Sequence, residues 1–217
     1  MTKGVILLSG GLDSLVALDI AAKKMDVVLA LTFDYFQKAL DEEIQAAQKI
    51  CNLYNIEHKI IQLPFLAKIT NNALTDDNNK NFSELKSVWI PNRNGLFLNI
   101  AASYCDSKGI DYIIFGANKE ESGNFSDNKP EYIKILDKCF EYSTMKHPTV
   151  FAPCSNMNKI DLVNYMIDNN ISFNLIKSCY QNQKDINKKH CAKCMSCKFL
   201  YNAILNSKKP ELIKEIF

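Results

Sequence analysis

The chain has 217 residues, of which 47% are hydrophobic, so it is long enough to bury a sizeable core within one main domain. Its 26 basic and 24 acidic residues nearly cancel to a formal charge of +2, which excludes a long-range basic surface for nucleic acid or membrane. Apolar runs are far shorter than the roughly 20 residues of a membrane span, and no signal peptide is recognisable, so we expect a soluble, cytoplasmic protein.

Short apolar runs alternate with amphipathic stretches along the chain, which is typical of βαβ units around a parallel sheet. Between the runs, apolar residues recur at helical spacing, as in Leu40, Ile44, Ala47, Cys51 and Tyr54. The pattern predicts an α/β fold with a doubly wound, mostly parallel sheet. Strands are expected at residues 5–8, 27–33, 58–63, 112–115 and 149–152, and helices around residues 15–24, 40–54, 98–105 and 158–167.

Two polar segments interrupt this alternation, at residues 71–94 and 118–130. The second segment follows directly after the fourth expected strand. Ligands of open α/β sheets bind beyond the carboxyl ends of the strands, so we expect both segments to line one pocket.

A glycine-containing loop, Ser9-Gly10-Gly11-Leu12-Asp13-Ser14, lies between the first expected strand and the first expected helix. Adjacent glycines let the backbone approach a ligand closely, and free N–H groups at a helix N-terminus favour an anion. The loop is therefore a candidate phosphate site, in which the two serines add hydroxyl donors and Asp13 caps the helix or holds magnesium. A Walker A loop has lysine where this chain has Asp13, and no G-x-G-x-x-G fingerprint is present. Neither a Walker ATPase nor a dinucleotide-binding protein is indicated.

The eight cysteines form a clustered group and a scattered group. The clustered group, spaced by eleven, two and two residues, consists of Cys179, Cys191, Cys194 and Cys197. Four thiolates satisfy a closed tetrahedral zinc site; an iron–sulfur cluster is the alternative, and unliganded thiols are a third interpretation. His190 is expected to lie outside the ligand set. The scattered group, expected to be buried in the core, consists of Cys51, Cys105, Cys139 and Cys154.

The glycine loop resembles the PP-loop of the N-type ATP pyrophosphatases, which cleave ATP to AMP and pyrophosphate. With further segments in the same order, nearly the whole chain resembles the QueC family of 7-cyano-7-deazaguanine synthases. The segments that carry this resemblance are residues 8–14, Phe33-Asp34-Tyr35-Phe36-Gln37, Pro91-Asn92-Arg93-Asn94-Gly95-Leu96-Phe97-Leu98, Phe115-Gly116-Ala117-Asn118-Lys119-Glu120-Glu121, and Ser178-Cys179-Tyr180 with the three later cysteines.

The resemblance implies an adenine nucleotide alpha hydrolase-like, Rossmann-like fold, with a PP-loop ATP-binding domain at residues 1–177 and a zinc-binding helical region at residues 178–217. It implies that ATP, with Mg²⁺, converts the carboxylate of 7-carboxy-7-deazaguanine into an adenylate, that ammonia gives an amide, and that further ATP drives dehydration to the nitrile. The loop would stabilise the charge on the departing pyrophosphate. A homodimer is also implied, without a membrane or a stable nucleic-acid partner.

The resemblance also implies roles for individual residues. Arg93 would be a second clamp, on phosphate or on the substrate carboxylate. The catalytic residues would be Ser9, Asp13, Ser14 and Arg93. The nucleotide contacts would be Leu8, Ser9, Gly10, Gly11, Leu12, Asp13, Ser14, Leu15, Val16, Ala17, Leu18 and Arg93. The substrate contacts would be Phe33, Tyr35, Gln37, Asn94, Glu120, Glu121 and Asp127. The carboxylates of Glu120, Glu121 and Asp127 would recognise ring N–H groups or help to hold magnesium. Among the aromatic residues, Phe125 is the weakest candidate for stacking on the purine-like ring of the substrate.

Two positions depart from the family pattern. Members often have glycine where this chain has Phe36, and many have a cysteine-arginine pair where it has Asn128-Lys129. The first departure is expected to narrow the pocket and the second to alter the substrate-recognition loop. Two alternatives stay open. One is another PP-loop reaction, such as tRNA thiolation or conjugation of a deazaguanine to another molecule; the other is a module that binds nucleic acid through its lysine-rich cysteine region.

Overall fold

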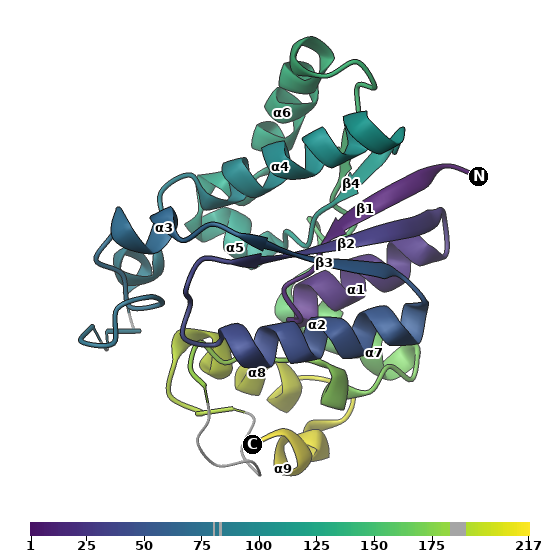
Figure 1. The fold of residues 1–217 in the computed structure, drawn as a ribbon. Coiled ribbons are helices and arrows are strands. Elements are labelled where there is room, and N and C mark those ends of the chain that lie inside the picture. Colours follow the sequence, from purple (N-terminus) through teal and green to yellow (C-terminus); the bar gives the residue numbers. More distant parts are fainter. Residues whose placement is uncertain (80, 83, 183–189) are drawn as a thin grey trace.

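The structure is a computed structural model that describes residues 1–79, 81–82, 84–182 and 190–217. At its centre is a parallel five-stranded sheet in the order β3-β2-β1-β4-β5 (Figure 1). The strands are β1 Lys3–Leu7, β2 Asp26–Asp34, β3 Glu57–Gln62, β4 Tyr112–Ile114 and β5 Thr149–Phe151. All five predicted strands are confirmed, with ends shifted by no more than two residues.

Helices cover both faces of the sheet, which confirms the doubly wound prediction (Figure 1). α4 and α6 lie against one face, and α1, α2 and α7 lie against the other, where α8 packs on α7. The helices are α1 Leu12–Ala22, α2 Leu40–Tyr54, α3 Phe65–Lys68, α4 Arg93–Lys108, α5 Lys119–Asn124, α6 Pro130–Ser143, α7 Lys159–Asp168, α8 Met195–Leu205 and α9 Ile213–Ile216. Short 3-10 helices are η1 Leu85–Val88, η2 Ser126–Asn128, η3 Phe173–Leu175 and η4 Pro210–Leu212.

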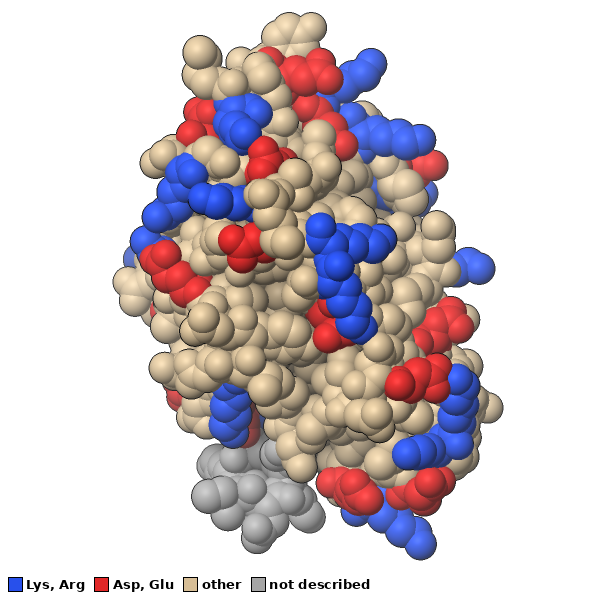
Figure 2. Space-filling model, turned by 90° about the vertical axis from the view of Figure 1, so that its right-hand side faces the viewer, with Lys and Arg blue, Asp and Glu red and all other residues tan. Residues whose placement is uncertain are grey.

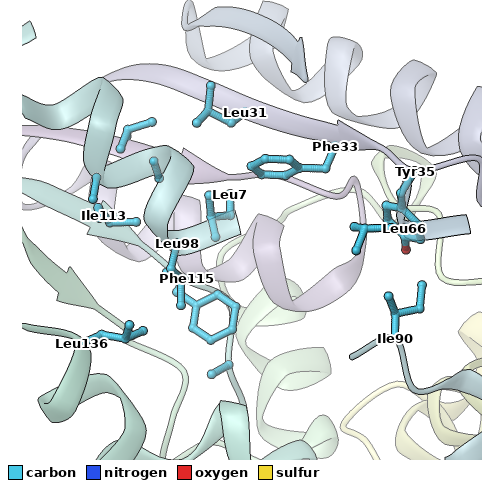
Figure 3. Close-up of a cluster of buried hydrophobic side chains, with 14 of the residues drawn as sticks. Leu7, Leu31, Phe33, Tyr35, Leu66, Ile90, Leu98, Ile113, Phe115 and Leu136 are labelled. Carbon is cyan, nitrogen blue, oxygen red and sulfur yellow. The ribbon is translucent and has the colours of Figure 1, made fainter. Parts of the chain in front are cut away.

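Two apolar clusters fill the spaces between the sheet and its helices. Figure 3 shows the cluster on the α4 and α6 face, where Leu7 and Ile113 of neighbouring strands meet Leu98 of α4. Ile6, which follows Val5 and precedes Leu7 in β1, belongs to the opposite cluster. Successive residues of β1 thus point to opposite faces, and both faces are buried. This explains why the strand reads as an unbroken apolar run.

The scattered cysteines do not all behave as predicted. Burial raises the pKa of Cys51 to about 11 and the pKa values of Cys105 and Cys154 to about 12, so these three are inert core thiols. The prediction for Cys139 is wrong, because this residue is exposed on α6. Its neighbour Phe140 is the fully buried residue of that turn and faces the sheet instead.

The strand order reverses beside β1. The chain moves outward from β1 to β3 and returns to β4 on the other side of β1. A crevice therefore forms at the carboxyl ends of β1 and β4. The described residues of segment 71–94, next to α3, and segment 118–130, which contains α5, both lie at this end of the sheet (Figure 1). Segment 118–130 is not an irregular polar loop, because much of it is helical. Asn118 caps α5 by accepting a hydrogen bond from Glu121 N at 2.9 Å, and η2 follows.

The C-terminal elements pack on the α7 side of the molecule. Leu200 and Ile204 of α8 belong to the same apolar cluster as α1 and α7. The division of the chain at residue 177 stays a prediction. Among the residues that the structure describes, no helix is long and apolar enough to cross a bilayer. On the face in Figure 2, basic and acidic side chains are interspersed, in keeping with the balanced charge of the sequence.

Candidate active site

The loop between β1 and α1 has the geometry of an anion site. Gly10 has φ +76°, and a Cβ added there would lie 2.8 Å from both the Ala46 side chain and the Glu43 carbonyl of α2. Only glycine fits this left-handed turn beneath α2. Gly11 is the N-cap residue of α1 and provides no side-chain cap. The first N–H groups of α1 have no intrahelical acceptor and suit a phosphate.

The two loop serines converge on this turn. Ser9 Oγ and Ser14 Oγ lie 3.3 Å apart, and Ser14 Oγ donates a hydrogen bond of 3.1 Å to the Gly11 carbonyl. Both side chains line a cavity of about 260 Å³ at the carboxyl end of the sheet. The later nucleotide contacts expected in α1 lie elsewhere. These residues are buried in the core and are absent from the described cavity wall: Leu15, Val16, Ala17 and Leu18.

Asp13 does not cap α1, contrary to one of its two expected roles. Its carboxylate accepts hydrogen bonds from Asn118 Nδ2 at 3.0 Å and from Lys159 Nζ at 2.5 Å. Lys159 Nζ also lies 3.4 Å from Glu121 Oε1. Burial alone would lower the pKa of Lys159, but the Asp13 and Glu121 carboxylates raise it overall, so the ammonium stays charged. A cluster of three charged side chains, contributed by α1, α5 and α7, therefore lies beside the glycine loop.

Lys159 was missed by the sequence analysis, although a signal for it exists. Asn158 and Asp161 form a full capping box, which makes Lys159 the first residue of α7. The helix dipole disfavours a cation at a helix N-terminus. A helix that follows a parallel strand also begins at the carboxyl edge of the sheet, where ligands bind. A lysine in that place indicates a functional role.

Another wall of the cavity is formed by the start of α4 and by η2. Arg93, the first residue of α4, donates a hydrogen bond of 3.2 Å to the Tyr35 hydroxyl, and its guanidinium lies 5.7 Å from the centre of that ring. Asp127 is buried in the same wall, and burial raises the pKa of its carboxyl even though Arg93 is near. Asn94 lines the cavity beside them.

The remaining expected substrate residues differ in position. Phe33 lines the cavity and stacks on Phe97, with ring centres 3.9 Å apart and planes at 5°. Gln37 also lines it, but its amide bonds the backbone of Phe33 and Tyr35 and the Glu43 carboxylate, so it shapes the loop after β2.

Glu120 is exposed, accepts a hydrogen bond from Lys159 N at 3.1 Å, and is not among the described cavity-lining residues.

The two departures from the family pattern have different consequences. Phe36 has φ +61°, a conformation that favours glycine, and the residue is 54% exposed. It is not among the described lining residues, so the expected narrowing of the pocket is not seen. Asn128 does line the cavity, and its amide donates to Asp127 Oδ1 at 3.1 Å. The second departure therefore lies in the expected recognition loop.

A late segment of the chain, residues 177–180, closes the cavity next to the glycine loop. Lys177 N donates a hydrogen bond of 2.8 Å to the Gly10 carbonyl, and Lys177 Nζ forms an ion pair with Glu42 of α2. Lys177, Ser178 and Tyr180 line the cavity, whereas Cys179 between them is buried. This segment therefore connects the glycine loop to the cysteine cluster.

The four clustered cysteines fit one tetrahedral metal ion. Their sulfur atoms all lie within 4.8 Å of one another, and Cys191 Sγ is 3.8 Å from Cys197 Sγ. A tetrahedral site with Zn–S bonds of about 2.3 Å requires sulfur separations of about 3.8 Å. A cluster of several irons would spread the ligands further apart. Cys194 N also donates to Cys191 Sγ at 3.2 Å, which suits a thiolate.

His190 lies beside this cluster and outside the ligand set, as expected. Ser178 N donates to His190 Nε2 at 3.3 Å, so the ring proton is on Nδ1, which donates to the Ile216 carbonyl at 3.2 Å. The buried imidazole thus joins the 177–180 segment to the C-terminal helix α9.

Solved structures share this fold. The chain superposes on a 4-thiouridine synthetase in complex with RNA and bound ATP with a TM-score of 0.54 and 18% identity, covering 99% of this chain and 49% of that one. For the NMN synthetase of Francisella tularensis the TM-score is 0.50 and the identity 17%, covering 85% and 70%. The fold and the glycine loop define a protein of the PP-loop, adenine nucleotide alpha hydrolase type.

Sequence comparison gives the family. The family model described as queuosine biosynthesis protein QueC matches residues 3–207. The 7-cyano-7-deazaguanine synthase of Methanosarcina mazei is 38% identical over 212 residues, which cover 90% of either chain. That of Carboxydothermus hydrogenoformans is 38% identical over 209 residues, covering 91% of this chain and 95% of its own. The chain belongs to the QueC family.

Proposed function

We propose that this chain is an ATP-dependent 7-cyano-7-deazaguanine synthase, a ligase that forms carbon–nitrogen bonds. One observation carries the proposal: the glycine loop, the charged group around Lys159, and the wall containing Arg93 and Asp127 line a single cavity. A phosphate site and a polar site with aromatic walls are thus within reach of one another. The similarity to two 7-cyano-7-deazaguanine synthases over most of their length supports the substrate.

In the first step, a carboxylate oxygen of 7-carboxy-7-deazaguanine attacks the α-phosphorus of ATP. A P–O bond forms while the bond to the bridging β-phosphate oxygen breaks, and pyrophosphate leaves. The N–H groups of α1, the Ser9 and Ser14 hydroxyls and the Lys159 ammonium stabilise the charge that gathers on pyrophosphate. Lys177 lines the cavity on the other side of the loop and adds a second cation.

In the later steps, ammonia attacks the acyl carbon, AMP leaves, and loss of a proton gives the amide. The amide oxygen then attacks a second ATP with release of pyrophosphate and a proton. Expulsion of the second AMP with loss of the remaining N–H proton forms the nitrile. The first ATP turns a carboxylate oxygen into a good leaving group, and the second ATP does the same for the amide oxygen. One phosphate site therefore serves both conversions.

The carboxylates beside the loop fit Mg²⁺. Asp13 and Glu121 both contact Lys159, so their negative charges already share one cation. Carboxylates together with substrate phosphate oxygens are the usual ligands of this ion, which would neutralise phosphate charge. Asp13 and Glu121 would hold the ion, and the Lys159 ammonium, which contacts both carboxylates in this structure, would then be available to pair with phosphate.

The cysteine cluster fits a structural zinc ion held by four thiolates, which leaves no position open for a substrate. We assign it the role of holding the 177–180 segment against the glycine loop. We also propose a cytoplasmic homodimer. Exposed apolar side chains on α8, which include Phe199 and Leu205, support such an interface.

A thiolation reaction is less well supported. PP-loop thiolation often uses a catalytic cysteine pair at the active site. None of the described residues that line the cavity is a cysteine, because the clustered cysteines are turned toward one another. The cavity instead offers carboxylates, amides and aromatic rings.

The direct test follows both deazaguanine species and adenine nucleotides when the metal-loaded protein receives 7-carboxy-7-deazaguanine, ATP, Mg²⁺ and ammonium. We expect the nitrile and AMP together, and we expect both to disappear in Asp13→Ala but not in Asp26→Ala, which removes an exposed carboxylate at the start of β2. AMP with a conjugate in place of the nitrile would assign a related PP-loop reaction. No AMP from folded protein would overturn the proposal.

A further inference from the structure

Two opposite charges, a half-buried Arg93 and a buried Asp127, lie in the wall formed by α4 and η2 without forming an ion pair with each other. Arg93 and Asp127 affect one another's pKa values, yet no salt bridge joins them among the described residues. Arg93 is instead fixed by the Tyr35 hydroxyl. Asp127 is fixed by the side-chain amides of Asn128 and Asn94. A donor and an acceptor that are close enough to influence each other thus line the same cavity.

Such a pair matches the edge of a guanine-type base. This edge presents an acceptor, O6, next to two donors, the N1–H and the exocyclic amine. A guanidinium can donate to O6 while a carboxylate accepts from N1–H and the amine. In a 7-deazaguanine the C7 substituent lies next to O6. A base that is read in this way therefore has its 7-carboxylate beside Arg93.

A stacked aromatic pair lines the same cavity. The rings of Trp89 and Phe125 are 5.6 Å apart and inclined by 12°, and both line the cavity. The Trp89 carbonyl accepts a hydrogen bond of 2.7 Å from Asn72 Nδ2, and Asn72 itself is buried. The main chain at Trp89 is therefore held in place before a ligand arrives. Flat heterocycles bind to proteins by stacking on such rings while their edges are hydrogen-bonded.

We propose that Trp89, Phe125, Arg93 and Asp127 form the subsite for the deazaguanine ring. Asp127 accepts from N1–H and the exocyclic amine, Arg93 donates to O6, and the Trp89–Phe125 stack covers the ring face. Asp127 is thereby the residue that selects a 2-amino base. This assignment rests on the proposed function, and it uses Arg93 for the base, in place of a clamp on the ATP phosphates.

The chain offers a direct probe, because Trp89 is its single tryptophan. Fluorescence of the metal-loaded protein is titrated with 7-carboxy-7-deazaguanine and, in parallel, with 7-carboxy-7-deazahypoxanthine, which lacks the exocyclic amine. We expect quenching by the first ligand and binding about ten- to a hundredfold weaker for the second, as loss of a hydrogen bond to a charged group predicts. Equal affinities would overturn the role of Asp127, and binding without a fluorescence change would overturn the role of Trp89.

Variants separate recognition from general damage. Asp127→Asn should weaken the 2-amino ligand strongly and bring the ratio of the two affinities close to one. Asp137→Asn is the matched control. Asp137 is also partly buried, with burial raising the pKa of its carboxyl, but it accepts from Val150 N near β5. The control should keep the full ratio. An unchanged ratio in Asp127→Asn would contradict the proposal.

The synthase assay on the same protein distinguishes this subsite from the proposed function. Nitrile and AMP formed by a protein that does not discriminate between the two ligands would leave the function standing and remove the subsite. Discrimination and quenching without any AMP would support the subsite and remove the synthase reaction.

Discussion

Lys159 Nζ lies 2.5 Å from Asp13 Oδ2, so the first residue of α7 is joined directly to the loop that follows β1. In Lys159→Met, the Asp13 and Glu121 carboxylates share the site without their common cation, and one source of positive charge for pyrophosphate is lost. We expect the rate of AMP formation to fall by about a hundred- to a thousandfold, and by less in Lys159→Arg.

The matched control is Lys208→Met. Lys208 pairs with Asp168 on the surface, where both side chains are at least half exposed. Surface pairs of this kind contribute little to stability, and no effect on AMP formation is expected. A similar loss of rate in both variants would show that the effect of Lys159 is not local to the loop.

Gly116 lies against the start of α1. A Cβ at this position would be 2.9 Å from Ser14 N, which belongs to the backbone and cannot swing away. We expect Gly116→Ala to displace the loop, to abolish detectable binding of an ATP analogue by calorimetry, and to lower the free energy of unfolding by about 1–3 kcal/mol.

Gly123→Ala is the comparison in the same part of the chain, within α5. An added Cβ there has no neighbour within 4 Å, and alanine favours a helix over glycine. We expect this variant to gain about 0.5–1 kcal/mol and to bind the analogue normally. Urea denaturation of the two variants checks both signs, and loss of stability in Gly123→Ala would contradict the argument.

Metal removal should affect the nucleotide site. Cys179 is flanked by the cavity-lining residues Ser178 and Tyr180, so loss of the metal frees the segment that closes the glycine loop. We expect Cys194→Ser to lose the bound metal by elemental analysis and to bind an ATP analogue at least tenfold more weakly, because the linked sites share this segment. Cys139→Ser, at an exposed position, should change neither quantity. Unchanged nucleotide binding in metal-free protein would refute the link.

Phe36 is strained without serving the cavity. Its φ of +61° disfavours any side chain with a Cβ, and its ring is exposed. Phe36→Gly should therefore raise the free energy of unfolding by about 1 kcal/mol with an unchanged KM for substrate. Phe36→Ala removes the same ring without relieving the backbone, and should gain nothing. A lower KM in both variants would show that the ring obstructs the pocket after all.

The sequence was sufficient for features that depend on local pattern. The strands, the turn at the glycine loop and the grouping of the four clustered cysteines follow from periodicity and residue type. Each of these is seen in the structure. Partners that are distant in the chain were harder to predict. Lys159 reaches Asp13 only because α7 begins at the same sheet edge as α1, and Trp89 meets Phe125 only after two polar segments fold together.

Side-chain direction was the other limit. Residues of α1 after Ser14 continue the loop in sequence, but the helix carries Leu15 and Val16 into the core. Cys139 and Phe140 are both apolar and adjacent in α6, but one step along a helix turns the side chain by about 100°. Phe140 is therefore buried, whereas Cys139 is exposed to water. Such differences depend on which face of the helix meets the sheet.

The hydrogen bond from Lys177 N to the Gly10 carbonyl has a consequence for synthesis of the protein. The glycine loop leaves the ribosome long before the segment that completes it, and that segment is itself fixed by cysteines as far along as Cys197. Pairing of segments so distant in sequence is a late event in folding. A nascent chain that already contains the whole sheet therefore still lacks part of the cavity wall beside the glycine loop, and this wall is completed only when the cysteine segment has folded.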